Sequence, residues 1–445
     1  MTKPKKLMGV QQCLISADKE VQAVLEYLCS ESNKLHNCAL YYARQMYFKA
    51  NKFVSGFDMI NEMRSSQNRH FHSFFNDAAN QTCQSVGESI RSFSALLKLW
   101  YKGQLPERPR FPNYRKAGYQ VVTYPARRLS LVDGRIKFPL GKQIKAWFGL
   151  SEFTLPMPTN LVFESLVEVR ILPRNGCFYA EFVYPDQRVQ CDVDPSRALG
   201  LDHGLNNWLT GLSNTGTSFI IDGLKLKSLN QWYNKRVATL SRNLPGESSP
   251  GEFRLKEGQA QGFWSKRLAA ITEKRNRQMR DAVNKAARIV ITHCLENRIG
   301  TVVFGWNKGQ KDSINLGSKT NQKFVQIPTA RLKGRIEQLC DKYGIHFVET
   351  EESYTSKASF LDADVLPVYS RSEGFANGEK PEGWTESGKR IKRGLYRAAD
   401  GTRINADCNG AANILRKVAV MLGLELSGIS RGDLTAPLKI RIWSV

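Results

Sequence analysis

The sequence predicts a multidomain α+β protein with a helical lobe, a small β-rich domain and a larger α/β domain. Three changes of pattern along the chain predict this order. Apolar residues recur at three- and four-residue spacing up to about residue 101, short β-rich segments bounded by Gly, Pro and Asp follow, and strands alternate with helices from about residue 195. In the 445-residue chain we therefore expect boundaries at 1–17 (first strand of the β-rich domain), 18–105, 106–194 and 195–445.

Composition and charge limit the class of protein. A hydrophobic fraction of 41% with 24% charged residues is typical of a globular chain. The 65 Lys and Arg residues exceed the 41 Asp and Glu residues, for a formal charge of +24. A surplus of this size, spread over the whole chain, favours a protein that binds the phosphate backbone of a nucleic acid over one whose surface is merely basic.

The cysteine pattern and the absence of long apolar runs indicate the compartment. No apolar run approaches the length of a membrane span. The nine cysteines include no C-x-x-C pair, which fits reduced, mostly buried thiols better than a disulfide scaffold. We therefore expect no membrane partner and a cytosolic location, or a nuclear one in a eukaryote.

Residues 18–105 are expected to form the helical lobe. Helical periodicity covers VQAVLEYLCSESNKLHNCALYYARQMYF and FNDAANQTCQSVGESIRSFSALLKLWY, joined by a linker with a short helix. Such a lobe is by default a bundle with its own core, and it can also serve as a recognition surface.

Residues 106–194 are expected to form a small antiparallel barrel or an open sheet, joined by the N-terminal strand KKLMGVQQCLI. The segments VDGRIKF and RNGCFYAEF contain the Asp-Gly and Asn-Gly pairs that favour tight hairpins. The segment PERPRFPNYRKAGYQ interleaves aromatic and basic residues, a pattern typical either of a solvated linker or of contact with nucleic acid. On the second interpretation the contacts are Arg108, Arg110, Arg115 and Lys116.

The C-terminal part alternates strands and helices, which indicates a mixed sheet. A strand with a hairpin, RALGLDHGLNNWLTGLSNTGTSFIIDG, precedes a long basic helical segment whose cationic face includes Lys266, Arg267, Arg275 and Arg277. The strand TVVFGW, the helix TARLKGRIEQLCDKYG, the strand IHFVETEE and a loop-rich insertion at about 357–402 follow. The last helix opens in RINADCNGAANILRKVAVMLG.

Two aspartates of this part are candidate metal ligands. Asp202 lies in an apolar strand start, where a carboxylate is costly to bury unless it caps, pairs or binds a cation. Asp407 precedes an apolar helix, so taken alone it is a candidate N-cap. An α/β fold that brings the two acids together would instead supply oxygen ligands for a pair of Mg²⁺ ions that hydrolyse a phosphodiester.

Several motifs together resemble a known family. GLDHGLNNWLTGLSNTG, the cationic helix before IGTVVF, the SYTSK that follows the third strand, and INADCNGAANILRKV are similar to the RuvC-type nuclease domain of the TnpB proteins of insertion sequences, which are related to compact type V CRISPR effectors. The resemblance covers roughly the C-terminal half in motifs. The helical lobe and the β-rich domain agree in order with that family's recognition domain and wedge β-barrel.

The resemblance implies an RNA-guided DNA endonuclease with an RNase H-like (RuvC) domain. Its partners would be a guide RNA and target double-stranded DNA, its cofactor Mg²⁺ with Mn²⁺ as the alternative, and its location the prokaryotic cytosol. Asp202 and Asp407 match the family's first and third catalytic acids, and Asn409 and Asn413 match asparagines expected to support the acid and the helix start. Neither the target nor the choice between monomer and dimer follows from it.

The second catalytic glutamate of the family is missing at its usual place. Where most members have a glutamate at the end of the second strand, this chain has Gly305. Two adjacent acids, Glu351 and Glu352, stand just before Tyr354-Thr355-Ser356 and are candidates to complete the site, although adjacent acids at a strand end are often only solvated. Strand alternation breaks down there, so we favour Glu351 as the metal ligand beside Asp202 and Asp407 and keep Glu352 open as a catalytic residue.

The insertion also departs from the family. Members typically have two C-x-x-C pairs there, whereas this chain has no cysteine between Lys357 and Ala406, so we predict no zinc. We expect the insertion to hold its shape through strands. Its residues Lys389, Arg390, Lys392 and Arg393 either line the substrate channel or form a solvated loop.

Gly305 also favours a second function. A guided DNA-binding protein without cleavage, such as a transposon-recruiting effector or a transcriptional repressor, would have no need of the missing glutamate. A strand transferase acting without RNA is a weaker interpretation, because it would leave the helical lobe unexplained.

Overall fold

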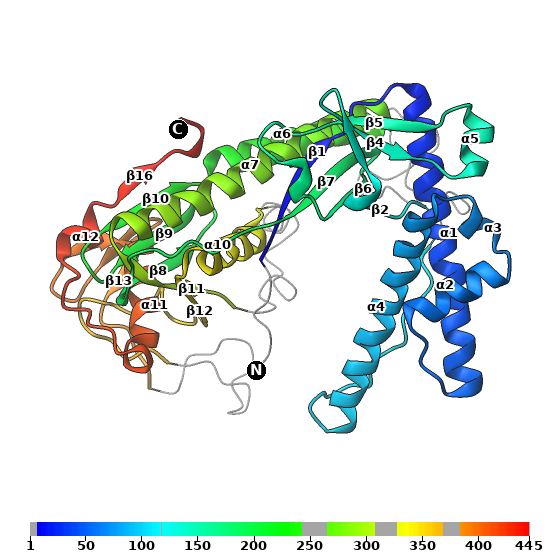
Figure 1. The fold of residues 1–445 in the computed structure, drawn as a ribbon. Helices are drawn as coiled ribbons and strands as arrows, with labels where there is room; N and C mark the ends of the chain where they lie inside the picture. Colours follow the sequence, from blue (N-terminus) through cyan, green and yellow to red (C-terminus); the bar gives the residue numbers. More distant parts are fainter. Residues whose placement is uncertain (1–6, 117, 243–264, 308–326, 368–382, 445) are drawn as a thin grey trace. The chain divides into compact units, whose positions relative to one another are not determined.

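The computed structural model describes residues 7–116, 118–242, 265–307, 327–367 and 383–444. They form a mixed α+β structure, which confirms the predicted class at that level (Figure 1). The chain divides into two compact units, Met1–Asp186 with Gly246–Glu273 (unit 1) and Gln187–Pro245 with Lys274–Val445 (unit 2). Among the described residues, the helices are too short or too polar to cross a membrane.

The helices of unit 1 form where periodicity predicts them, and side chains cap the starts of α1 and α2. Asp18 accepts a hydrogen bond from the backbone N of Val21 at 2.8 Å, and Ser55 and Asp58 form a reciprocal capping box. The linker between the two long helices contains two helices where one was expected. The four are α1 (Lys19–Ala50), α2 (Gly56–Ser65), α3 (Arg69–His72) and α4 (Asn76–Tyr101).

The β-rich part of unit 1 forms two antiparallel sheets with the orders β1-β7-β6-β2 and β3-β4-β5. Both predicted hairpins form, and Asp133-Gly134 and Asn175-Gly176 have the positive φ angles that such tight turns require. The described strands pair as two separate sheets, so the predicted barrel is not confirmed. The elements are β1 (Met8–Leu14), β2 (Val122–Pro125), β3 (Ser130–Val132), β4 (Arg135–Pro139), α5 (Lys142–Phe148), β5 (Glu152–Pro156), β6 (Glu168–Arg174) and β7 (Cys177–Pro185).

Helices and sheets of unit 1 share one hydrophobic core. Leu28 of α1 and Val86 of α4 belong to the same buried cluster as Tyr124 of β2 and Phe182 of β7. The division of this unit into a helical domain (18–105) and a wedge domain (1–17 and 106–194) therefore stays a prediction.

Unit 2 is built on the predicted mixed sheet, with strand order β12-β11-β8-β9-β10-β16. β8 pairs antiparallel with β9 and parallel with β11, and β11 pairs parallel with β12. The parallel strands β8, β11 and β12 are neighbours, so their C-terminal ends lie together on the same side of the sheet. The strands are β8 (Asp194–His203), β9 (Asn207–Ser213), β10 (Ser218–Asp222), β11 (Ile299–Gly305), β12 (His346–Thr350) and β16 (Leu438–Ile440).

Helices cover both faces of this sheet, and alternation along β8 decides which residue meets which helix. Leu199 and Leu201 share a buried cluster with residues of α7 and α10. Ala198 shares another with Ile414 and Leu415 of α11 on the opposite face (Figure 1). The helices are α6 (Leu224–Arg242), α7 (Lys266–Glu296, in unit 2 from Lys274), α10 (Thr329–Tyr343), α11 (Ala406–Leu422) and α12 (Arg431–Thr435).

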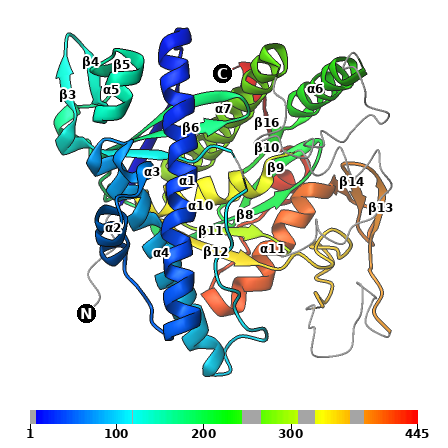
Figure 2. The ribbon, with the colours of Figure 1, turned by 90° about the vertical axis from the view of Figure 1, so that its right-hand side faces the viewer.

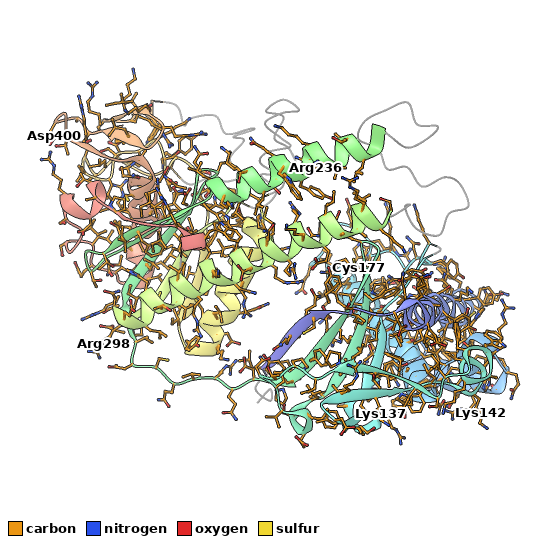
Figure 3. All side chains as sticks on the ribbon, turned by 90° about the horizontal axis from the view of Figure 1, so that it is seen from above. Lys137, Lys142, Cys177, Arg236, Arg298 and Asp400 are labelled. Atoms are coloured by element: carbon orange, nitrogen blue, oxygen red, sulfur yellow. The ribbon has the colours of Figure 1, made fainter. Side chains whose placement is uncertain are left out.

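Two local features complete unit 2. Arg298 lies between α7 and β11 (Figure 3) and has φ +54°, which turns the chain toward the sheet. Its Nη2 donates to Asp192 Oδ1 at 2.9 Å. The insertion contains a three-stranded antiparallel sheet directly before α11, so the expected strands form (Figure 2). These strands are β13 (Lys389–Lys392), β14 (Leu395–Arg397) and β15 (Arg403–Asn405).

Replacing Gly200 tests how closely α11 packs on β8. A Cβ at this position would lie 2.5 Å from the backbone O of Ala411, which cannot move without the helix. Gly200→Ala should therefore destabilise the protein by about 1–3 kcal/mol, as overpacked core positions do. Thermal melting measures the effect.

The matched control is Gly334→Ala in α10, where a Cβ would meet no atom within 4 Å. Alanine in a helix interior is favoured over glycine by about 1 kcal/mol, so this variant should melt slightly higher than wild type. Equal stability of the two variants would contradict the close packing of α11 on β8.

Candidate functional site: an acidic cavity at the end of β8

Asp202 and His203 at the end of β8 open onto a cavity of about 420 Å³. Glycines leave room for the Asp202 carboxylate. A Cβ on Gly410 of α11 would lie 2.8 Å from Asp202 Oδ2. Asp202 is therefore held between the sheet and a helix that approaches without a side chain at this point.

Asp407 lines the same cavity from the first turn of α11. The helix is capped by Asn405, whose side chain accepts from the backbone N atoms of Asp407 and Cys408 at 2.9 and 3.1 Å. The alternative that Asp407 itself is the N-cap is therefore wrong. Its carboxylate instead accepts from Asn207 Nδ2 at 2.6 Å and from Arg390 Nη2 at 3.3 Å.

Glu352 is the third carboxylate of the cavity. β12 ends at Thr350, so Glu352 lies in the turn beyond the strand. Its backbone N donates to Asn307 Oδ1 at 3.0 Å, and its backbone O accepts from Thr355 Oγ1 at 2.9 Å. Together with the left-handed φ of Tyr354 (+63°), these bonds turn the Glu352 side chain back toward Asp202.

Glu351, the residue that the sequence slightly favoured, is placed elsewhere. Its carboxylate forms an ion pair with Lys417 of α11, whose side chain is only 4% exposed. The other carboxylate oxygen accepts from the backbone N of Ser353 at 2.8 Å. Burial lowers the pKa of Lys417, and the hydrogen bond and charge of Glu351 oppose that shift. The structure thus brings Asp202, Glu352 and Asp407 together and leaves Glu351 outside the cavity lining.

Gly305 at the end of β11 lies beside this cluster. A Cβ there would lie 2.5 Å from Ile414 Cδ1 and 3.4 Å from Glu352 Oε2. The space in front of Gly305 is thus already filled by an isoleucine and by the Glu352 carboxylate. A glutamate side chain at position 305 would compete with both.

The electrostatics of the cavity fit a divalent cation. Burial, then the charge of Glu352 and then that of Asp407, raise the pKa of Asp202 well above its usual range. The oxygen-rich donor set suits Mg²⁺ or Mn²⁺. The ligand atoms of Asp202, His203 and Glu352 all lie within 4.8 Å of one another. A bound cation would relieve the repulsion that raises this pKa.

The buried asparagines of α11 support the loop after Glu352. Asn413 Nδ2 donates to the backbone O atoms of Thr355 and Ala358 at 2.9 and 2.8 Å. Asn409 Nδ2 donates to Ala358 O at 2.7 Å. They therefore hold the segment that follows Glu352, whereas the helix start, which they were expected to support, is capped by Asn405.

Some functional contacts were missed from the sequence. Asn207, Asn307 and Lys417 orient the acids, and His203 lines the cavity with them. The Asn-Asn pair shortly after Asp202 was a signal for Asn207. No local pattern indicates the ion pair between Lys417 and Glu351, which lie 66 residues apart.

The predicted nucleic-acid contacts fall in both units. Arg390 and Arg393 of the insertion line the acidic cavity, and Lys389 and Lys392 are exposed on β13 beside them. Arg275 instead bonds Asn230 Oδ1 at 2.6 and 3.1 Å, which ties α7 to α6. The remaining predicted residues all have exposed side chains: Arg108, Arg110, Arg115, Lys116, Lys266, Arg267 and Arg277.

Comparison with known proteins supports the family resemblance over part of the chain. Residues 181–310 match the family model OrfB_IS605, described as a probable transposase. The matched segment includes Asp202 and Gly305 and ends before Glu352 and Asp407. No curated protein matches the chain significantly.

Several solved structures are similar to this chain at low identity. One is a Cas12f1–sgRNA–target DNA complex, with 14% identity over 89% of this chain and 83% of that chain and a TM-score of 0.49. A ternary complex of AacC2c1 with sgRNA and extended non-target DNA has 9% identity over 92% and 70%, with a TM-score of 0.40. The mini-RNA-guided endonuclease CRISPR-Cas_phi3 has 10% identity over 96% and 93%, with a TM-score of 0.36.

Asp202 should lower the stability of the metal-free protein. Its pKa in the folded protein is raised above the ~3.9 of an unfolded aspartate, so the unfolded chain loses the Asp202 proton at a lower pH than the folded protein does. The free energy of unfolding therefore falls as pH rises from about 4 toward the raised pKa. Asp202→Asn removes this cost at neutral pH. We expect its melting midpoint in EDTA to rise by roughly 2–4 °C, which corresponds to about 1 kcal/mol.

The matched control is Asp400→Asn, an exposed aspartate (Figure 3) whose hydrogen bonds from Thr402 lower its pKa. This variant should melt slightly lower than wild type. A lower midpoint for Asp202→Asn as well would show that Asp202 is not repelled by its neighbours.

Proposed function

We propose that this protein is an RNA-guided DNA endonuclease of the TnpB kind that acts in the prokaryotic cytosol. One observation is decisive for the proposal: Asp202, Glu352 and Asp407, from three separate segments of unit 2, line one cavity although Gly305 replaces the usual glutamate. The mixed sheet, with one acid at the end of its central strand β8 and another on the later helix α11, is consistent with an RNase H-like (RuvC) domain.

In this proposal Asp202, Glu352 and Asp407 hold divalent ions, Mg²⁺ or Mn²⁺. Such ions activate the attacking water and stabilise the leaving oxygen of a phosphodiester. Asn207 holds the Asp407 carboxylate at 2.6 Å, and the buried ion pair with Lys417 keeps Glu351 away from the ions.

Arginine side chains beside the acids would orient the phosphate backbone of the substrate. Arg390 and Arg393 extend from the insertion into the cavity lining. Their guanidinium groups match phosphate geometry. In this proposal Lys389 and Lys392 of β13 bind the DNA backbone farther from the carboxylates.

The helical residues 18–105 and the sheets of unit 1 would hold the guide RNA and read duplex DNA, as recognition and wedge domains. The exposed residues Arg108, Arg110, Arg115 and Lys116 are the proposed contacts there, and Lys266, Arg267 and Arg277 those on α7. A heteroduplex is held by its backbone and read by pairing, so these contacts give affinity and not target sequence.

Sequencing the RNA that co-purifies with the protein tests guidance. We expect one discrete species with a constant scaffold and a variable end. Random host transcripts would contradict the proposal.

Glutamine substitutions at 352 and 351 test which glutamate completes the site. Glu352→Gln should lower Mg²⁺-dependent cleavage of guided DNA by about 100-fold or more, because it removes a charged ligand from the ions that stabilise the leaving oxygen. Glu351→Gln keeps an oxygen for Lys417 and should cut within a few-fold of wild type. Cleavage is measured on supercoiled plasmid with the co-purified RNA.

The reverse ranking, with Glu351→Gln inactive and Glu352→Gln active, would overturn the assignment of Glu352. RNA-dependent DNA binding without nicking by the wild-type protein would instead establish the second function, a guided DNA-binding protein that does not cut.

A further inference from the structure

His203 lines the acidic cavity but has no part in the function proposed above. It follows Asp202 directly at the end of β8. Neighbouring residues within a strand point to opposite faces, yet here both side chains line one cavity because the strand ends at His203. An imidazole therefore lies beside the carboxylates of Asp202 and Glu352, in the cavity that Asp407 also lines.

The position of the His203 ring is compatible with metal ligation. His203 Nδ1 lies 3.7 Å from Glu352 Oε2, and both side chains are 12% exposed. Two ligand atoms that are each about 2.1 Å from one ion lie at most about 4.2 Å apart, so this pair can share an ion. A carboxylate oxygen of Asp202 lies within 4.8 Å of both atoms, close enough to join them on one ion after a small rotation of the side chain.

Aromatic residues restrict the ring. Phe304 and Trp306 pack edge-on against His203, with ring centroids 6.0 and 5.4 Å away. Lys333, on the neighbouring helix α10, has its Nζ atom 5.2 Å from the centroid of the Trp306 ring. A ring confined in this way loses little rotational freedom when it binds an ion.

We infer that His203 is a nitrogen ligand that shares one divalent ion with Asp202 and Glu352, and that this makes the site favour Mn²⁺ over Mg²⁺. The inference rests on the proposed function, whose metal site it specifies further. Mg²⁺ is a hard ion that takes oxygen ligands, whereas imidazole nitrogen suits transition ions. The alternative role of His203, a plain ion pair with Glu352, gives no preference among metals.

Pulsed EPR detects the proposed bond directly. The full chain is purified with its RNA from cells in which histidine alone carries ¹⁵N, so that RNA nitrogen remains ¹⁴N. With Mn²⁺ added, we expect a ¹⁵N hyperfine coupling that is present in wild type and lost in His203→Asn. A coupling that survives in His203→Asn, or no ¹⁵N coupling in a wild type that binds Mn²⁺, overturns the inference.

Equilibrium binding measures the preference. His203→Asn should weaken Mn²⁺ binding by at least about tenfold, the scale of effects around metal ligands, and change Mg²⁺ binding much less. The control is His346→Asn, an exposed histidine at the opposite end of β12, which should bind both ions like wild type. Equal losses for Mn²⁺ and Mg²⁺ in His203→Asn would overturn the metal preference.

Asp202→Asn separates failure of this inference from failure of the proposed function. If Asp202→Asn abolishes Mn²⁺ binding and His203→Asn leaves it unchanged, the metal site stands and His203 is not a ligand. If Asp202→Asn binds Mn²⁺ like wild type, the metal site itself is wrong, and the inference falls with it.

Discussion

The close packing of α11 on β8 is the constraint on which the site depends. It needs Gly200 on the strand and Gly410 on the helix, because a Cβ on either would meet the Ala411 backbone O at 2.5 Å or Asp202 Oδ2 at 2.8 Å. This approach brings the first turn of α11, with Asp407, to the end of β8, where Asp202 lies. Ile414 and Leu415, buried against Ala198 and Val303, provide the apolar contacts that hold the two elements together.

The packing that builds the site also makes it electrostatically unfavourable without a cation. Three carboxylates converge, and burial with mutual repulsion raises the pKa of Asp202. The neighbouring acid Glu351 is neutralised separately by the buried Lys417. The same helix therefore presents one acid, positions the loop of another through Asn413, and removes a third from the cavity. Function here costs stability, as is common at sites that bind charge.

The sequence predicted the parts of the fold that rest on local patterns. The Asp-Gly and Asn-Gly hairpins, the helices and the mixed sheet follow from periodicity and turn chemistry. It also singled out Asp202 and Asp407. It favoured Glu351 over Glu352 only slightly, because β12 ends at Thr350 and strand alternation no longer decides where a side chain points.

What the sequence could not predict depends on contacts between distant segments. The partner of Glu351 lies 66 residues later, and Asn405 rather than Asp407 caps α11 because of the preceding strand β15. The strands of unit 1 were expected in a barrel or an open sheet, and those that the structure describes pair as two sheets, since hairpin signals fix neighbours in sequence but not the closure of a sheet.

The claim that Asp202, Glu352 and Asp407 form one metal site can be tested by locating the metal. Crystals of the protein with its RNA, soaked in Mn²⁺ and measured at the manganese absorption edge, give anomalous density at bound ions. The account predicts a peak in contact with all three carboxylates and none on Glu351. A peak held by Glu351, or no peak in the cavity, would contradict it.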